Sequence, residues 1–296
     1  MCIKKQTHDF VFMLVSINMT LETIPKKKDC SISVKENRGS NMYQLGKKIF
    51  DKIPILRPML IKGQQNFRPK FSGIGMTSFH TLPDEQFFKK IMSELHKFST
   101  NENQYCYSDK MMDENYWKFY FVAFASSYAV KSTGLSSLVE CGVANGYSAF
   151  VALKSVKNSE MHLYDAWNVM KDDLISESEK AIRGYYKTLD INFTKYNLKE
   201  FGSTRWHQGY IPETLDNSSP KLISYLHIDL NSSIPTFEAL TFFYPKILNG
   251  GVILFDDYGL NDYAETKQVI DQFLINKNGT MFKLPTGQAM FFVLKP

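Results

Sequence analysis

The sequence has 296 residues, of which 44% are hydrophobic and 22% are charged, and this is the composition of a soluble globular protein. No run approaches the roughly 20 apolar residues that a membrane span requires. The net charge of +5 is unevenly spread, because residues 1–70 hold 14 Lys and Arg against 5 Asp and Glu, which leaves a charge of −4 for residues 71–296. The basic excess therefore belongs to the first quarter of the chain.

Residues 1–70 lack sustained periodicity and are rich in lysine and proline, so we expect a basic, partly irregular N-terminal arm. We expect this arm to be a solvated, partly disordered extension, and contact with anionic surfaces is the alternative. Residues 10–19 are apolar, but no small-residue cleavage site follows them before the next lysines, so we expect a cytoplasmic protein. The four cysteines are scattered without metal-ligand spacing, which predicts free thiols in a reducing compartment.

After the arm, the hydrophobic pattern predicts a helical segment over 71–134 and an α/β domain over 135–296. Helical spacing of apolar residues indicates helices at 83–98 and at 115–130, the second rich in aromatic residues. The alternating pattern that follows predicts strands at 137–141, 161–165, 204–208, 222–230 and 251–257, and helices at 147–157, 173–188, 234–247 and 263–276. Short apolar strands between helices predict a mostly parallel sheet with helices on both faces. Residues 281–284 and 289–294 form a predicted hairpin, so the last of seven strands should be antiparallel.

The stretch from Leu138 to Phe150 contains the glycine-rich turn around which we expect the domain to be organised. Glu140 is followed by Gly142 and Gly146, at the junction between a predicted strand and a predicted helix. Glycines let a ligand approach the backbone, and the helix start offers unpaired N–H groups to an anion. Asp165 ends the next strand, where a carboxylate accepts hydrogen bonds from ribose hydroxyls in nucleotide sites or caps the following helix.

Three more carboxylates end later strands: Asp229 follows one, and Asp256 and Asp257 follow another. Ligands bind beyond the carboxyl ends of parallel strands, so these residues should lie together. Clustered carboxylates repel one another unless a cation is present, and oxygen ligands favour Mg²⁺ or Ca²⁺ over zinc. The alternative is that one of Asp256 and Asp257 caps a loop while the other faces solvent.

Several motifs in chain order carry a family resemblance. They are Val-Glu-Cys-Gly-Val-Ala-Asn-Gly-Tyr-Ser at 139–148, Tyr-Asp at 164–165, Gln-Gly-Tyr-Ile-Pro-Glu-Thr-Leu at 208–215, Leu-His-Ile-Asp at 226–229, and the block from Phe243 to Gly259. The chain resembles the macrocin O-methyltransferase (TylF/MycF-like) family of class I S-adenosylmethionine-dependent methyltransferases, over about residues 71–296. Residues 145–148 also resemble the catechol-type O-methyltransferases.

The resemblance implies a Rossmann-like fold, S-adenosylmethionine as cofactor, and O-methylation of a sugar hydroxyl in a glycan or natural product, assisted by Mg²⁺. Implied cofactor-binding residues are Glu140, Gly142, Gly146, Ser148, Asp165, Gln208 and Gly209. The implied metal ligands are Asp229, Asp256 and Asp257, and Asp229 is the implied general base. The resemblance further implies a homodimer. We expect no nucleic-acid partner, because the basic residues are concentrated in residues 1–70 and no Asn-Pro-Pro-Tyr-like motif is present.

The sequence departs from the family pattern where a second Asp commonly follows two residues after the first, because this position is Asn231. Two rival hypotheses are an NAD-dependent oxidoreductase and a non-catalytic cofactor-binding module. Against the first stand the missing Gly-x-Gly-x-x-Gly turn and the Asp256-Asp257 block; against the second stands the full set of strand-end carboxylates. His207 and His227 lie on predicted strands, where structural roles are expected, with His227 a core histidine whose hydrogen bonds are satisfied.

Overall fold

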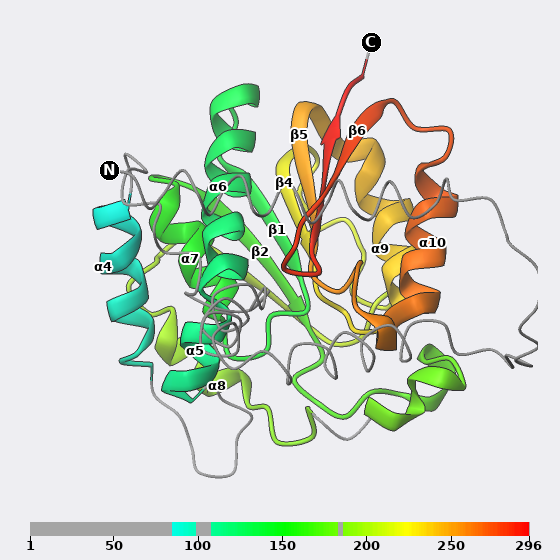
Figure 1. The fold of residues 1–296 in the computed structure, drawn as a ribbon, viewed down its shortest axis with the longest axis horizontal. Coiled ribbons are helices and arrows are strands. Elements are labelled where there is room, and N and C mark those ends of the chain that lie inside the picture. The colour runs from blue at the N-terminus through cyan, green and yellow to red at the C-terminus, as the bar shows by residue number, and fades with distance from the viewer. Residues whose placement is uncertain (1–84, 99–107, 183–185, 296) are drawn as a thin grey trace, which may run out of the picture. The chain divides into compact units, whose positions relative to one another are not determined.

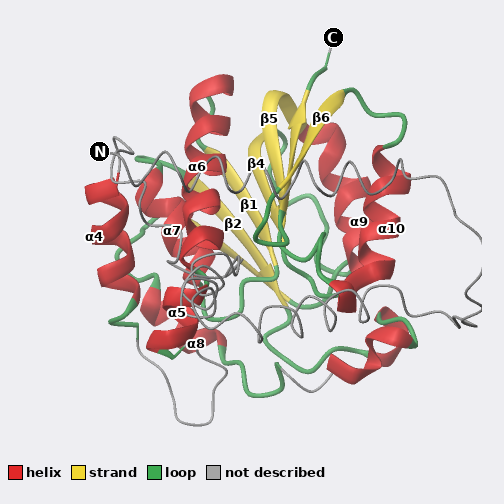
Figure 2. Ribbon diagram, in the orientation of Figure 1, coloured by secondary structure: helices red, strands yellow, loops and turns green. Residues whose placement is uncertain are grey.

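A seven-stranded sheet forms the centre of the computed structural model, which describes residues 85–98, 108–182 and 186–295. The strand order is β3-β2-β1-β4-β5-β7-β6. The strands are β1 (Ser137–Cys141), β2 (Glu160–Asp165), β3 (Thr204–Gln208), β4 (Ile223–Ile228), β5 (Ile247–Phe255), β6 (Gly279–Lys283) and β7 (Ala289–Val293). The first five pair in parallel, and β7 is antiparallel to both of its neighbours. This confirms the predicted sheet, including its antiparallel last strand. Figure 2 shows the sheet with helices on either side.

Helices cover both faces of the sheet, as predicted from the alternating sequence pattern (Figure 1). One layer contains α4, α6 and α7, and the other contains α9 and α10. The described helices are α4 (Glu85–Leu95), α5 (Asp109–Glu114), α6 (Tyr116–Thr133), α7 (Tyr147–Ser155), α8 (Ile191–Asn197), α9 (Ser233–Phe243) and α10 (Ala264–Leu274). Each layer encloses its own apolar core against the sheet, because both faces of β1, β4 and β5 are buried.

The aromatic helix α6 packs across the sheet, as the sequence predicted for a core element. Phe119 and Val122 are buried, and Tyr116 and Tyr120 meet Phe88 of α4 edge-to-face, with ring centroids 5.0 and 5.4 Å apart. Gly134 ends the helix with φ +71°, in the left-handed region that glycine enters without steric cost. Although α6 is 18 residues long, no helix in the described part of the chain is long and apolar enough to cross a membrane.

The segment after β2 differs from the single helix predicted over residues 173–188. It contains two short 3₁₀ turns, η2 (Asp172–Leu174) and η3 (Ser178–Ile182), and the next α-helix is α8. Glu179 explains the difference: its buried carboxylate accepts hydrogen bonds from Ser176 N, Ser232 Oγ and Ser233 N, at 2.9, 2.8 and 2.8 Å. The free N–H groups at the start of α9 attract the Glu179 carboxylate. The segment is therefore held by this contact and does not form the continuous helix that was predicted.

The predicted domain division and cysteine chemistry are described only in part. Residues 1–84 lie outside the described residues, so the basic arm and the first part of the helical segment stay predictions. Of the four cysteines only Cys141 is described; its thiol is free and fully buried in β1, and burial raises its pKa. This agrees with the free thiols expected from the sequence.

Candidate active site

A cavity of about 360 Å³ opens at the carboxyl ends of β1, β2, β4 and β5. Its wall includes seven of the predicted site residues: Gly142, Ser148, Asp165, Gly209, Asp229, Asp256 and Asp257. Glu140, Gly146 and Gln208 do not line it. Gln208 is exposed at the end of β3, and Gly146 lies behind the wall, where its left-handed backbone (φ +85°) begins α7. The cavity has the size of ordinary small-molecule sites.

The glycine turn is fixed by the close approach of two strand ends. Asp229 N donates to Cys141 O over 2.8 Å, which holds the end of β4 against the end of β1. Gly142 adopts φ +88°, and a Cβ at this position would lie 1.8 Å from the carbonyl oxygen of Asp229. Glycine is therefore required here by both backbone conformation and space.

Asp165 holds the glycine turn in place. Its Oδ2 accepts hydrogen bonds from Val143 N and Ala144 N at 2.7 and 2.8 Å, and its Oδ1 accepts from Trp167 N at 2.6 Å. Burial raises the pKa of Asp165, and these backbone donors oppose the rise. The carboxylate thus joins the β1 turn to the β2 end, at the wall where a ribose-binding residue is predicted.

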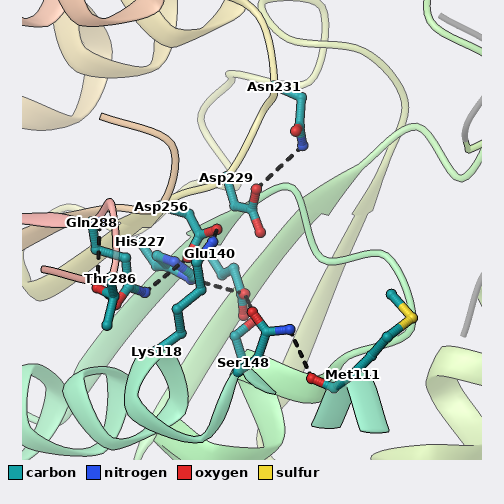
Figure 3. Close-up of polar contacts among 11 residues, drawn as sticks. Met111, Lys118, Glu140, Ser148, His227, Asp229, Asn231, Asp256, Thr286 and Gln288 are labelled. Carbon is teal, nitrogen blue, oxygen red and sulfur yellow. Dashed lines mark hydrogen bonds and ion pairs between the residues drawn. The ribbon is translucent and has the colours of Figure 1, made fainter. Parts of the chain in front are cut away.

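Glu140 is fully buried in β1 and does not line the cavity. Its Oε1 accepts hydrogen bonds from Ser148 Oγ of α7 and from His227 Nδ1, the latter at 3.0 Å (Figure 3). The strand register places Glu140 opposite His227, on the sheet face covered by α6 and α7. His227 lines the cavity above, which the sequence did not predict.

The three predicted metal ligands lie in the cavity wall, but their environments differ. Burial and the neighbouring Asp256 and Asp257 raise the pKa of Asp229 well above its ordinary range. Burial and Asp256 raise the pKa of Asp257 to about 7. Burial acts in the same direction on Asp256, but Lys118, His227 and Gln288 together outweigh it and hold that pKa below its usual value. Asp256 is therefore the most readily ionised of the three.

Lys118 and Gln288 complete the surroundings of Asp256, and neither was predicted from the sequence. Lys118 Nζ of α6 lies 2.6 Å from Asp256 Oδ2, and Gln288 Nε2 donates to Asp256 Oδ1 over 2.8 Å (Figure 3). Burial acts to lower the pKa of Lys118, but Asp256 and Asp257 raise it, so the ammonium stays charged. A signal was present: Lys118 is the only charged residue between Tyr116 and Val130, and a lysine in an apolar helix is seldom buried unless paired.

The acidic group fits a divalent cation. When all three aspartates are ionised, their charge exceeds that of Lys118 by two units, which a divalent ion would balance. Oδ2 of Asp257 is buried and has no hydrogen-bond partner among the described residues. One ring nitrogen of His227 and one carboxylate oxygen each from Asp229 and Asp256 lie within 4.8 Å of one another. Donors that converge in this way can share one ion.

Another part of the cavity wall is largely apolar and aromatic. It includes Met170, Leu174, Ile175, Tyr186, Leu189, Tyr210, Leu260 and Tyr263. Lys171 lies 4.2 Å from the Tyr210 ring centroid and 2.5 Å from Glu213, so its charge is balanced. Tyr210 OH in turn donates to Val169 O over 2.7 Å, which fastens the segment after β2 to the wall. The acidic group and these apolar and aromatic side chains thus line the same cavity.

A family model described as macrocin-O-methyltransferase (TylF) matches residues 132–281, which is half of the chain. Mycinamicin III 3''-O-methyltransferase from Micromonospora griseorubida is 21% identical over 172 residues, which cover 49% of this chain and 67% of that protein. The match to the family model spans the glycine turn and all of the strand-end carboxylates.

Solved structures show the same fold at low sequence identity. The O-methyltransferase NovP superposes with a TM-score of 0.60 and 14% identity, covering 72% of this chain and all of that one. The calicheamicin methyltransferase CalS11 has a TM-score of 0.51 and 13% identity, covering 72% of this chain and 94% of that one.

Proposed function

We propose a function for this chain from its membership of the macrocin O-methyltransferase (TylF) family, which makes it an S-adenosylmethionine-dependent O-methyltransferase. The proposed reaction is methylation of a sugar hydroxyl in a glycan or natural product, with the help of a divalent cation. The observation that carries this proposal is the shared cavity. Predicted cofactor residues (Gly142, Ser148, Asp165) and predicted metal residues (Asp229, Asp256, Asp257) line one space. The similarity to mycinamicin III 3''-O-methyltransferase is supporting evidence for a natural-product acceptor.

On the cofactor side, S-adenosylmethionine would supply an electrophilic methyl group. The turn between β1 and α7 would receive its amino-acid part, with Ser148 at the helix start near the carboxylate, and Asp165 would accept hydrogen bonds from the ribose. Gly209 at the end of β3 would lie near the base. Since the methyl group moves in one displacement step, the protein contributes mainly by aligning donor and acceptor.

On the acceptor side, Asp229 is the proposed general base. Its carboxylate lies in the cavity wall beside Asp256 and Asp257, within a space where an acceptor hydroxyl could bind and transfer its proton to it. Asp229, Asp256 and Asp257 would hold the cation, whose charge would lower the pKa of the acceptor hydroxyl. The family resemblance implies Mg²⁺ for this role. The apolar and aromatic wall would bind the remainder of the acceptor by contact.

Calorimetric titration with S-adenosylhomocysteine, with and without Mg²⁺, tests the cofactor assignment. We expect micromolar binding by the wild type and at least a tenfold loss in Asp165→Ala. Asp190→Ala is the matched control, because Asp190 also accepts a backbone N–H, from Asn192 at 2.8 Å, but lies outside the cavity wall. No binding by the wild type would sink the proposal. Binding of NADH instead, followed by its fluorescence, would favour the oxidoreductase.

A second experiment tests the acceptor class. The full chain would be incubated with S-adenosylmethionine carrying a deuterated methyl group and with two panels of acceptors, glycosides and catechols. Mass spectrometry should find the label on a sugar hydroxyl, and EDTA should reduce its incorporation. Labelling of catechols alone would replace the sugar assignment with a catechol-type one.

A further inference from the structure

His227 is a buried histidine with one nitrogen engaged and one unpaired. Its ring is 1% exposed, and Nδ1 lies 3.0 Å from Glu140 Oε1. Nε2 is buried and has no hydrogen-bond partner in the described part of the chain. An unpaired polar atom in the interior lowers stability, so such an atom calls for a partner that the protein residues do not supply.

The Glu140 carboxylate sets which nitrogen of His227 carries the proton. Oε1 receives hydrogen bonds from both Ser148 Oγ and His227 Nδ1 (Figure 3). A carboxylate accepts and an imidazole N–H donates, so the proton lies on Nδ1 and the lone pair lies on Nε2. Metal-binding histidines show this arrangement: one nitrogen ligates, and the other donates to a carboxylate that fixes the ring.

The unpaired nitrogen belongs to a side chain that converges with carboxylates. A ring nitrogen of His227 and oxygens of Asp229 and Asp256 lie within 4.8 Å of one another, although no other described histidine lines this cavity. His227 lies in β4 and Asp229 follows two residues later, just after the strand ends. Asp256 directly follows β5, which pairs with β4. Asp256 shares its Oδ2 with Lys118 and its Oδ1 with Gln288, and each oxygen keeps a second lone pair.

We propose that His227 is a metal ligand together with Asp229 and Asp256, that Glu140 orients its ring, and that this nitrogen-containing site binds Mn²⁺ or Co²⁺ in preference to Mg²⁺. Mg²⁺ favours an all-oxygen shell, whereas imidazole raises the affinity for first-row transition metals. The inference rests on the proposed function only in that the cation serves the same cavity. It adds one nitrogen ligand, from His227, to the all-aspartate ligand set expected from the family resemblance.

Pulsed electron paramagnetic resonance of the Mn²⁺-loaded full chain tests the ligand directly. Electron spin echo envelope modulation reports ¹⁴N bound to Mn²⁺, and we expect this modulation in the wild type and its loss in His227→Gln. His162→Gln is the matched control, because His162 and His207 form a separate histidine pair with nitrogens 2.9 Å apart. No ¹⁴N modulation in the wild type, or modulation lost in His162→Gln rather than His227→Gln, would overturn the proposal.

Calorimetric titration with Mn²⁺ and with Mg²⁺ measures the metal selectivity of the site. We expect the wild type to bind Mn²⁺ at least tenfold more tightly than Mg²⁺, and His227→Gln to lose at least tenfold in Mn²⁺ affinity while Mg²⁺ affinity changes by less than about threefold. Equal affinity of the wild type for both ions would overturn the preference. Titration of the same samples with S-adenosylhomocysteine separates the His227 proposal from the proposed function. Binding of S-adenosylhomocysteine without ¹⁴N modulation would overturn only the His227 proposal. Modulation without binding of S-adenosylhomocysteine would overturn only the proposed function. The wild-type spectrum decides even when the variant fails to fold.

Discussion

At the scale of single residues, Lys118 is the cation paired with the acidic group of the cavity. Its side chain is 19% exposed and that of its partner Asp256 is 14% exposed, so solvent screens their attraction only weakly. The lysine holds the pKa of Asp256 down while the pKa values of Asp229 and Asp257 are raised. One ammonium from α6 thus makes the three aspartates chemically different from one another.

Lys118→Met should lower the free energy of unfolding by about 3 kcal/mol at pH 7.5, because it leaves a buried carboxylate without its counter-charge. Lys154→Met is the control: Lys154 contacts Glu94 and Glu200 in more exposed pairs, and its loss should cost less than about 1 kcal/mol. Urea unfolding followed by circular dichroism measures both. Equal losses in the two variants would show that the Lys118–Asp256 pair has no special weight.

A second residue pair predicts how stability depends on pH. His162 Nδ1 and His207 Nε2 are 2.9 Å apart, so one ring donates and the other accepts, and protonation of both would break the hydrogen bond. Burial and the neighbouring His207 lower the pKa of His162 to about 4, and burial also lowers that of His207. Tyr164 stacks on His207 with ring centroids 4.0 Å apart, which keeps the pair in place.

His162→Gln should flatten the loss of stability in acid. The folded-state pKa of about 4 lies below the unfolded value of about 6.5, so the neutral histidine's contribution is present above pH 6.5 and disappears as the pH falls toward 4. Urea midpoints between pH 7.5 and pH 4.5 should therefore decline more steeply for the wild type than for the variant. His96→Gln, at an exposed histidine after α4, is the control. Parallel declines for wild type and His162→Gln would contradict the prediction.

At the scale of elements, two glycines have similar backbone conformations but differ in how much space surrounds them. Gly134 ends α6 with φ +71°, and Gly142 follows β1 with φ +88°. A Cβ at Gly134 would meet nothing within 4 Å, whereas a Cβ at Gly142 would overlap the carbonyl oxygen of Asp229 at 1.8 Å. The two positions have similar conformations and differ in the space around them.

Gly134→Ala should cost about 1–2 kcal/mol of stability, the strain of a left-handed alanine. Gly142→Ala should cost more than about 4 kcal/mol, because the ends of β1 and β4 must also move apart. Chemical denaturation compares the two, and a Gly142→Ala protein that is unfolded at 25 °C agrees with the expectation. Similar costs at both positions would show that the β1–β4 junction yields easily.

The sequence predicts elements well where local pattern decides, and poorly where distant residues decide. Short apolar strands between amphipathic segments indicate a parallel sheet, and the antiparallel hairpin follows from its glycine turn. The helix predicted over residues 173–188 is wrong because Glu179 binds the start of α9 instead. Lys118 and Gln288 meet at Asp256 from helix α6 and from the turn before β7, and no local pattern encodes that meeting. His227 was expected to be fully satisfied, yet Glu140 satisfies one nitrogen and the described residues leave the other unpaired.

At the scale of the whole described domain, the cavity lies at the point in the sheet where the strand order reverses. From β1, the order runs through β2 to β3 on one side and through β4 to β5 on the other. The loops after β1 and β4 diverge at such a point, which opens space at the carboxyl ends of the strands. Gly142 and Asp229 flank this opening, so the cavity follows from the topology before any particular side chain is considered.

Saturating S-adenosylhomocysteine should raise the melting temperature of the domain as a single transition. A ligand at 100 times its dissociation constant adds about 2.7 kcal/mol, which corresponds to roughly 5–10 °C for a domain of this size. Differential scanning calorimetry measures the shift, and NADH at the same concentration is the control. A larger shift with NADH than with S-adenosylhomocysteine would contradict the proposed ligand.

The placement of β7 between β5 and β6 affects how the protein can form during its synthesis. β6 precedes β7 in the chain but pairs only with β7 in the described sheet, so a ribosome must release residues up to about 293 before β6 can dock. Gln288, which holds Asp256, arrives with the same late strand. A nascent chain stalled ahead of this point would carry β1 to β5 with an unpaired edge and an incomplete acidic group. Productive folding of the cavity is therefore an event that follows translation of β7, and chaperones that shield sheet edges would act in that interval.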